Sequence, residues 1–293
     1  MGAATSLPTV AFIGTGVMGH SMAGHLMTAG YPVIVFNRTP EKAADLVQRG
    51  AKPASSAGEA SAGADVTITI VGYPTDVEEV YLADDGIISR ARPGATVIDM
   101  TTSTPTLALR IADAAAARGL FSLDAPVSGG DIGAREARLT IMVGGDESAY
   151  DRALPIFQVL GRTVTYMGGA GLGQHTKMAN QISIAGTMLG AVEALAYAKA
   201  AGLDPHRVLD AISAGAAGSF SLSTYGPRIL AGDMKAGFYV KHFVKDLRIA
   251  LGEAEAMGLE LPGLDLAKRL YVRLAEQGGE DLGTQALWEL YRR

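Results

Sequence analysis

A glycine-rich turn directly follows a short apolar run near the start of the chain, and it constrains the fold more than any other stretch. Residues 10–13 read Val-Ala-Phe-Ile, and three glycines follow in the spacing G-x-G-x-x-G. After a strand, this spacing predicts a tight turn into a helix whose first N–H groups point at a bound pyrophosphate. Because glycine is abundant, at 37 of 293 residues, a plain turn is the alternative interpretation. The predicted dinucleotide contacts are Gly14, Thr15, Gly16, Val17, Met18 and Gly19.

A second apolar run over residues 31–36 completes a β-α-β unit with the helix predicted for residues 17–29. NAD-binding sites usually place an Asp or Glu after this strand, where it accepts a hydrogen bond from the ribose 2′-hydroxyl. This chain has Asn37, Arg38 and Thr39 there instead. A guanidinium pairs well with a 2′-phosphate, the two neighbouring side chains can donate hydrogen bonds, and this segment has no carboxylate to repel the phosphate. The sequence therefore favours NADP over NAD, unless Arg38 only occupies a surface turn.

Strand and helix patterns alternate as far as residue 167, which predicts a doubly wound parallel sheet. Ligands bind at the carboxyl edge of such a sheet, so the loops after the strands should face the cofactor. In one of these loops, Ser128, Gly129 and Gly130 offer a hydroxyl and accessible backbone N–H groups that suit a carboxylate. The later predicted strands are residues 66–71, 96–98, 121–123, 139–143 and 163–167, and the loops are 72–74, 99–105 and 124–130.

The pattern changes at a cluster of glycines over residues 168–173, after which no convincing strand follows. We therefore expect a dinucleotide-binding Rossmann domain over residues 1–168 and an all-α domain over residues 169–293, joined by a long helix. The predicted helices of the second domain cover residues 176–201, 205–214, 243–257, 263–277 and 284–291.

Three polar residues open the long helix on one face. Lys177, Asn180 and Gln181 are three and four positions apart, and the rest of the helix is mostly Ala, Ile, Leu and Met. Polar groups buried there without partners would be costly, so a ligand is one way to satisfy them. A solvated lysine at a helix end is the alternative interpretation.

The composition excludes several classes of function. A net charge of −5 gives no reason to expect nucleic acid or an acidic membrane as partner. The absence of cysteine excludes disulfides, thiolate nucleophiles and Cys-ligated zinc, and no metal is predicted. The apolar residues 182–198 contain Glu193 and suit a buried helix better than a membrane span. Residues 1–8 show no secretory signal, so a cytoplasmic location is expected.

Five motifs, in order and spanning nearly the whole chain, resemble those of the β-hydroxyacid dehydrogenase family. They are GTGVMGHSMA, NRT, DAPVSGG with LTIMVGGD, GLGQHTKMANQ and VKDL. That family includes 3-hydroxyisobutyrate dehydrogenases, tartronate semialdehyde reductases and glyoxylate or succinic semialdehyde reductases. The resemblance implies NADP(H)-dependent hydride transfer between a small β-hydroxyacid and its aldehyde acid. It also supports a homodimer or homotetramer, which the alanine-rich long helix suggests.

The resemblance implies roles for individual residues. Lys177 would be the acid/base, which requires a pKa near the working pH, through partial burial and a neighbouring cation such as Lys245. Relatives often have two asparagines after this lysine, whereas Asn180 is followed here by Gln181, and Ala137 replaces a common glycine. The remaining assignments are Ser128, Gly129, Gly130, Asn180 and Gln181 to the substrate, Thr102 and Lys245 to the nicotinamide end, Tyr73 and Pro74 to the adenosine part, and Asn37, Arg38 and Thr39 to the NADP-preferring branch.

Other interpretations of the same architecture are open. An imine reductase would share the fold and NADPH, but such relatives typically have another residue in place of Lys177. A 6-phosphogluconate dehydrogenase would need a much longer helical domain. An NADPH-binding sensor without catalysis is the non-enzyme alternative. Residues 215–228 fit either a pocket lining or subunit contact, or a set of helix caps and core residues.

Overall fold

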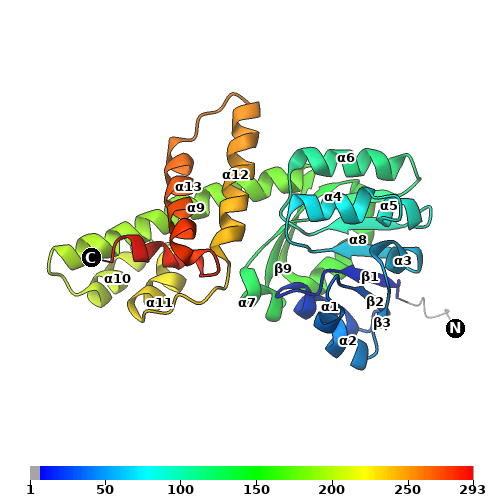
Figure 1. The fold of residues 1–293 in the computed structure, drawn as a ribbon, viewed down its shortest axis with the longest axis horizontal. Helices are drawn as coiled ribbons and strands as arrows, with labels where there is room; N and C mark the ends of the chain where they lie inside the picture. The colour runs from blue at the N-terminus through cyan, green and yellow to red at the C-terminus, as the bar shows by residue number, and fades with distance from the viewer. Residues whose placement is uncertain (1–6, 293) are drawn as a thin grey trace. The chain divides into compact units, whose positions relative to one another are not determined.

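The computed structural model describes residues 7–292 (Figure 1). Residues 1–6, which hold most of the segment considered for a secretory signal, lie outside the described residues, as does Arg293. The chain forms two compact units, and the division between them falls between Lys177 and Met178. That division lies inside α9 (Leu172–Ala200), the long helix that the sequence predicts.

The first unit is built on one sheet of nine strands, in the order β3-β2-β1-β4-β5-β6-β8-β7, with β9 beside β8. Six neighbouring strands, from β3 to β6 in that order, are parallel. This part of the sheet confirms the predicted doubly wound arrangement. The strands are β1 (Val10–Ile13), β2 (Val33–Phe36), β3 (Lys52–Pro53), β4 (Val66–Thr69), β5 (Thr96–Asp99), β6 (Phe121–Asp124), β7 (Val127–Ser128), β8 (Leu139–Gly145) and β9 (Gly161–Gly168).

The sheet departs from a parallel arrangement on one side, because β8 runs antiparallel to both β6 and β7. Only residues 129–138 connect β7 with β8, and they include the short helix α7 (Gly130–Arg135). A parallel crossover needs a dozen or more residues, so this connection returns the chain in the opposite direction. At its end Ala137 has a φ of 51°, in the left-handed region where glycine is preferred. This backbone conformation suits the glycine that the resemblance implies at this position.

Helices cover both faces of the sheet (Figure 1). On one face, apolar side chains of α1, α2 and α8 form a core with alternate strand residues such as Val10 and Phe12. On the other face, α3, α4, α5 and α6 pack against residues such as Ala11 and Ile13. Alternation along β1 therefore sends neighbouring side chains into two separate cores. The helices are α1 (Gly19–Thr28), α2 (Ala44–Gln48), α3 (Ala57–Ala62), α4 (Pro74–Leu82), α5 (Ile87–Arg90), α6 (Pro105–Ala116) and α8 (Glu147–Leu160).

The second unit is helical, as predicted, and α12 and α13 run side by side in it (Figure 1). Its core includes the α9 residues Met188, Val192 and Leu195, so the apolar part of α9 is packed within the protein. Across residues 7–292, no helix combines the length and the apolar character that a membrane crossing requires. The elements after α9 are α10 (Pro205–Ser213), a π-helical turn (Ser221–Tyr225), α11 (Gly226–Leu230), α12 (Val240–Ala256), α13 (Pro262–Leu274), a second π-helical turn (Ala275–Gly279) and a 3₁₀ helix (Thr284–Leu290).

Part of residues 215–228 serves as cap and core. The Ser219 hydroxyl accepts a hydrogen bond from the Leu222 N–H at 3.2 Å, and the Leu222 side chain is buried. Phe220 is 65% exposed and packs edge-on against Tyr225, with ring centroids 5.8 Å apart. The cap-and-core interpretation therefore holds for Ser219 and Leu222.

Candidate active site

Two glycines of the turn after β1 are required by the protein's own backbone. Gly14 has a φ of 95°, and a Cβ atom there would lie 2.2 Å from the Ile70 carbonyl oxygen. A Cβ atom on Gly19 would lie 1.9 Å from the Gly14 carbonyl oxygen, at the close approach of α1 to the turn. No side chain fits at either position without moving the backbone.

Unlike Gly14 and Gly19, Gly16 is not required by a close contact with the protein's own backbone. It is exposed, and a Cβ atom built on it meets nothing within 4 Å. Beside it, the Thr15 hydroxyl is buried and has no hydrogen-bonding partner among the described residues. An open glycine and an unused hydroxyl at the start of a helix fit a pyrophosphate group. The turn, with Val17 exposed and Met18 half-buried, therefore suits a dinucleotide cofactor.

Asn37 holds the loop after β2 against the glycine turn. Its Oδ1 accepts a hydrogen bond from the Thr15 N–H at 2.8 Å, and its Nδ2 donates to the Thr39 carbonyl oxygen at 2.8 Å. The amide nitrogen has a second N–H donor, so the predicted contact of Asn37 with the 2′-phosphate stays a prediction. Asn37 sets the position of the segment that carries Arg38.

Arg38 is exposed and has an acidic neighbour that the sequence argument missed. Its Nη1 lies 3.3 Å from Asp76 Oδ1, and Asp76 comes from the first turn of α4. The expectation that this segment has no carboxylate is correct for residues 37–39 but not for the folded site. The sequence does contain a local indication that Asp76 lies here. In a helix that begins with Pro74, an acid three positions after Tyr73 usually accepts a hydrogen bond from the N–H of the capping residue. That N–H does donate to Asp76 Oδ2 at 3.0 Å.

A buried carboxylate holds the start of α9 against the end of β6. Asp124 Oδ1 accepts a hydrogen bond from the Gly171 N–H, and Oδ2 accepts one from the Gln174 N–H, both at 2.8 Å. These N–H groups have no partner within the helix itself, so Asp124 acts as its cap. A Cβ atom on Gly173 would lie 2.4 Å from the Asp124 carbonyl oxygen, which explains a glycine in this first turn.

Gln174 connects the same helical turn to the loop after β5. Its Oε1 accepts a hydrogen bond from the Ser103 N–H at 3.0 Å, and its Nε2 donates to the Thr101 carbonyl oxygen at 2.8 Å. The side chain is fully buried. Thr102, predicted to line the nicotinamide end, lies between the two residues that Gln174 holds. The sequence offered only a weak signal for Gln174, a polar residue within the GLGQHTK motif.

The structure brings Lys177 to the predicted substrate loop. Its Nζ donates a hydrogen bond to the Val127 carbonyl oxygen at 2.8 Å, and its side chain is buried. Val127 directly precedes the half-buried Ser128 and the exposed Gly129, and Gly130 begins α7. An ammonium group therefore lies beside the hydroxyl and the N–H groups predicted to bind a carboxylate.

Two buried acids occupy paired positions on neighbouring strands of this site. Asp99 of β5 and Asp124 of β6 are register partners. Burial raises the pKa of each from 3.8 to about 6, against the hydrogen bonds that favour the charged form. For Asp99 the charged form is favoured by the side chain and N–H of Thr101, the latter at 3.0 Å, and by the Thr69 hydroxyl at 2.9 Å. The folded protein therefore binds these protons more tightly than the unfolded chain does.

The raised pKa of Asp124 predicts a pH-dependent stability that Asp124→Asn removes. The stabilisation that the Asp124 carboxyl gives the folded protein is fully present below pH 3.8 and is lost as pH rises through about 6. It is lost because this carboxyl ionises at a lower pH in the unfolded chain than in the folded protein. We expect wild type to lose about 1–3 kcal/mol of unfolding free energy relative to Asp124→Asn across this window. Urea unfolding at pH 4.5, 6 and 7.5 measures it. The exposed Asp113→Asn is the control, and a constant difference between wild type and Asp124→Asn would contradict the assignment.

The helical unit contains a second group of predicted site residues. The Asn180 Nδ2 donates a hydrogen bond to Gln181 Oε1 at 2.8 Å, and the Gln181 Nε2 donates to Asp246 Oδ2 at 2.6 Å. Lys245 Nζ lies 3.2 Å from Asp246 Oδ1. Gln181 is buried and each end of its amide makes one hydrogen bond, so it supports Asn180, and its predicted contact with the substrate stays a prediction. The sequence missed Asp246, although it stands within the VKDL motif.

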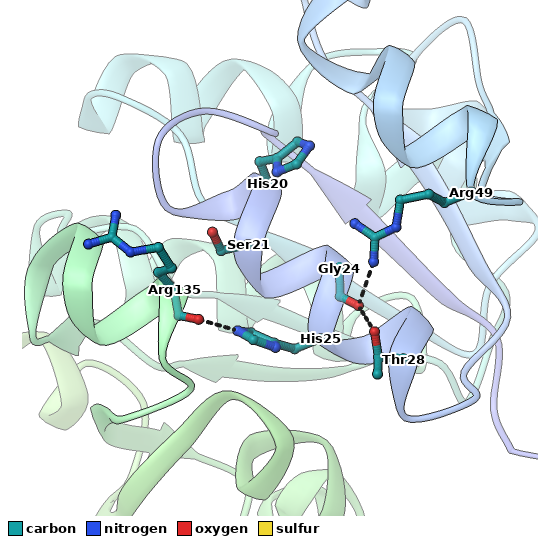
Figure 2. Close-up of a pocket in the computed structure, with 7 residues that line it drawn as sticks. All are labelled: His20, Ser21, Gly24, His25, Thr28, Arg49 and Arg135. Atoms are coloured by element: carbon teal, nitrogen blue, oxygen red, sulfur yellow. Dashed lines mark hydrogen bonds between the residues drawn. The ribbon is translucent and has the colours of Figure 1, made fainter.

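A shallow surface pocket of about 300 Å³ lies elsewhere, on the solvent face of α1 (Figure 2). Its basic groups are engaged with the protein. His25 Nε2 lies 3.0 Å from the Ala134 carbonyl oxygen, and Arg49 Nη2 donates to the Gly24 carbonyl oxygen at 3.4 Å. The pocket contains none of the residues predicted to contact cofactor or substrate, so it is not the candidate active site.

Two family models and several known proteins match nearly the whole chain. Residues 9–168 match the family model of the NAD binding domain of 6-phosphogluconate dehydrogenase. Residues 171–291 match the model described as NAD-binding of NADP-dependent 3-hydroxyisobutyrate dehydrogenase. An Arabidopsis thaliana protein named probable 3-hydroxyisobutyrate dehydrogenase-like 1, mitochondrial, is 55% identical over 279 residues, which are 95% of this chain and 83% of that protein.

Two solved structures share the fold. The Mycobacterium tuberculosis 3-hydroxyisobutyrate dehydrogenase with L-serine has a TM-score of 0.91 and 33% identity, over 98% of this chain and 100% of that one. Psf3 in complex with NADP⁺ and 2-OPP has a TM-score of 0.88 and 28% identity, over 96% and 99%. The fold, the glycine turn and these relatives define an NAD(P)-dependent oxidoreductase that acts on CH–OH groups. More specifically, the chain belongs to the β-hydroxyacid dehydrogenase family, which confirms the resemblance seen in its motifs.

Proposed function

We propose that this protein interconverts a small β-hydroxyacid and its aldehyde acid, uses NADP(H), and relies on Lys177 as acid/base. The observation that carries the proposal is the Lys177 Nζ bound to the Val127 carbonyl oxygen at 2.8 Å. It places a buried ammonium next to Ser128, in the loop that suits a carboxylate. Asp124 and Gln174 fix the helical turn that precedes this lysine.

The substrate carboxylate would bind to the Ser128 hydroxyl and to the N–H groups of Gly129 and Gly130. L-Serine, present in the Mycobacterium tuberculosis structure, is itself a small β-hydroxyacid, which supports this class of substrate. The Asn180 amide would orient the substrate oxygen, with Gln181 and Asp246 behind it. Lys245, Thr102, Tyr73 and Pro74 remain proposed cofactor contacts.

When bound, the nicotinamide supplies or accepts the hydride. Lys177 would hold a proton at Nζ and give it to the substrate oxygen during reduction, or accept it during oxidation. The Val127 carbonyl oxygen orients Nζ, so that the lysine depends on the substrate loop for its position. Lys177 is only 6% exposed, which limits the contact of its Nζ proton with solvent.

Consumption of NADPH in the presence of candidate aldehyde acids tests the proposal. The panel is glyoxylate, succinic semialdehyde and methylmalonate semialdehyde, and we expect turnover with at least one of them. Tight NADPH binding without turnover on the whole panel would instead favour the NADPH-binding sensor. We also propose a cytoplasmic homodimer or homotetramer, which the exposed aromatic side chains of Tyr197 and Phe220 support.

The preference for NADP rests on Arg38 and predicts a selective loss of affinity. Its guanidinium follows β2 at the carboxyl edge of the sheet, and NADP⁺ bound to Psf3 supports the same choice of cofactor. We expect Arg38→Ala to weaken NADPH binding about tenfold, the lower range for a charge-assisted hydrogen bond, and to leave NADH binding unchanged. Fluorescence titration of both cofactors measures this.

Arg92→Ala is the matched control for that substitution. Arg92 is also an exposed arginine in an ion pair, with Asp65 at 2.7 Å, but Asp65 precedes β4 and so lies at the opposite edge of the sheet. Equal losses for NADPH and NADH in Arg38→Ala, or an equal loss in Arg92→Ala, would refute the phosphate-binding role.

A further inference from the structure

The ion pair of Arg38 and Asp76 spans the end of β1. Strands β2 and β4 flank β1 on either side, and all three run parallel, so the segments after them leave the sheet at the same edge. Arg38 follows β2, and Asp76 lies in the first turn of α4, just after β4. Their Nη1 and Oδ1 atoms are 3.3 Å apart. The pair therefore joins the two segments beside the glycine turn, where the adenosine half of a dinucleotide binds in this fold.

Asp76 is the more firmly held member of the pair. Its Oδ2 accepts the hydrogen bond from the Tyr73 N–H, and its side chain is 23% exposed. The Arg38 side chain is 83% exposed. A Cβ atom on Gly72 would lie 3.0 Å from Asp76 Oδ2, so the carboxylate also fits closely against the preceding loop. The position of the negative charge is thus set by α4, while the guanidinium extends to it from the neighbouring loop.

We propose that Asp76 determines how strongly the enzyme prefers NADP over NAD, by competing with the 2′-phosphate for Arg38. The inference rests on the proposed function, in which Arg38 binds that phosphate. The phosphate can pair with Arg38 only by displacing the Asp76 carboxylate, so the free energy of the existing ion pair opposes phosphate binding. The ribose 2′-hydroxyl of NAD is neutral and meets no such opposition. Asp76 therefore lowers the preference for NADP and leaves NAD binding as it is.

Asp76→Asn separates the charge of this residue from its capping role. Asparagine keeps an oxygen for the Tyr73 N–H and removes the negative charge. We expect NADPH to bind about three- to fivefold more tightly, the range that an exposed ion pair provides, with NADH binding unchanged. Nicotinamide fluorescence titration of the purified full-length protein measures both affinities. The gain should shrink at high ionic strength, because salt screens the ion pair of Asp76 with the exposed Arg38 guanidinium.

Glu78→Gln is the control for loss of one negative charge. Glu78 lies on the same helix and is exposed, and it also pairs with an arginine, Arg110, at 2.8 Å. We expect this variant to leave both affinities unchanged. If Asp76→Asn lowers the thermal unfolding temperature, Asp76→Gln supplies a second uncharged acceptor for the Tyr73 N–H. In Arg38→Ala/Asp76→Asn, the aspartate substitution should no longer improve NADPH binding.

The outcomes separate this inference from the proposed function. Unchanged or weaker NADPH binding in Asp76→Asn, while Arg38→Ala weakens it, would overturn the role of Asp76 alone. If Arg38→Ala has no effect on NADPH, the proposed phosphate site itself fails. An equal gain in Glu78→Gln would assign the effect to net charge and also overturn the inference.

Discussion

Replacing Lys177 with alanine should lower turnover by about two to four orders of magnitude, the usual contribution of a general acid/base. The residue is buried and its Nζ is held by the Val127 carbonyl oxygen. Alanine removes the only proposed proton carrier at the substrate loop. NADPH affinity should change little, because the glycine turn and Arg38 are untouched. Steady-state turnover and fluorescence titration of NADPH measure the two quantities separately.

Lys177→Arg is the matched variant, because it keeps a cation that can donate to the Val127 carbonyl oxygen. A guanidinium stays charged throughout the working pH range and cannot pass its proton to the substrate oxygen. We expect turnover to remain as low as in the alanine variant. Near-normal turnover in either variant, with the protein folded, would disprove the role assigned to Lys177.

Gly16→Ala should weaken binding of both NADPH and NADH at least tenfold without loss of stability. A methyl group at Gly16 meets no protein atom within 4 Å, so it would occupy space that the pyrophosphate needs. Loss of one charge-assisted hydrogen bond to a phosphate corresponds to about 1.5–3 kcal/mol, or at least a tenfold change. Replacing glycine also reduces the freedom of the unfolded chain, so the unfolding free energy should stay equal or rise slightly.

Gly19→Ala is the informative companion, because its Cβ atom would collide with the Gly14 carbonyl oxygen. We expect a loss of unfolding free energy of about 1–3 kcal/mol or more, as overpacking against backbone produces. Cofactor titration and urea unfolding on both variants test the contrast. Intact cofactor affinity in Gly16→Ala would show that this glycine does not face the pyrophosphate.

Local patterns predicted the elements that depend on nearby residues. The glycine turn, the parallel strands and the helical second unit all have short-range signals in apolar periodicity and glycine placement. The antiparallel direction of β8 also has a basis in the sequence, because the connection of residues 129–138 is short. The uniform alternation of apolar segments makes this connection easy to overlook. The strand direction follows from the length of that connection rather than from the strands.

The residues that fix the candidate site were harder to predict, since their partners are far away in the sequence. The helix was expected to begin at Thr176, yet α9 begins at Leu172. Its cap is the side chain of Asp124, 50 residues before Gln174, whereas local capping rules consider only the neighbouring residues. The contact between Arg38 and Asp76 likewise joins positions 38 apart, and only the folded sheet brings them together.

The two hydrogen bonds of Gln174 connect the loop of residues 99–105 to the first turn of α9, so the two segments form one structural unit. A loop of different sequence grafted over residues 99–105 would leave a buried amide facing the wrong backbone groups, unless Gln174 were exchanged with it. Libraries that redesign this loop for new substrates should therefore vary Gln174 together with Thr101 and Ser103. Loop exchange alone would lose the alignment of the helical turn that leads to Lys177.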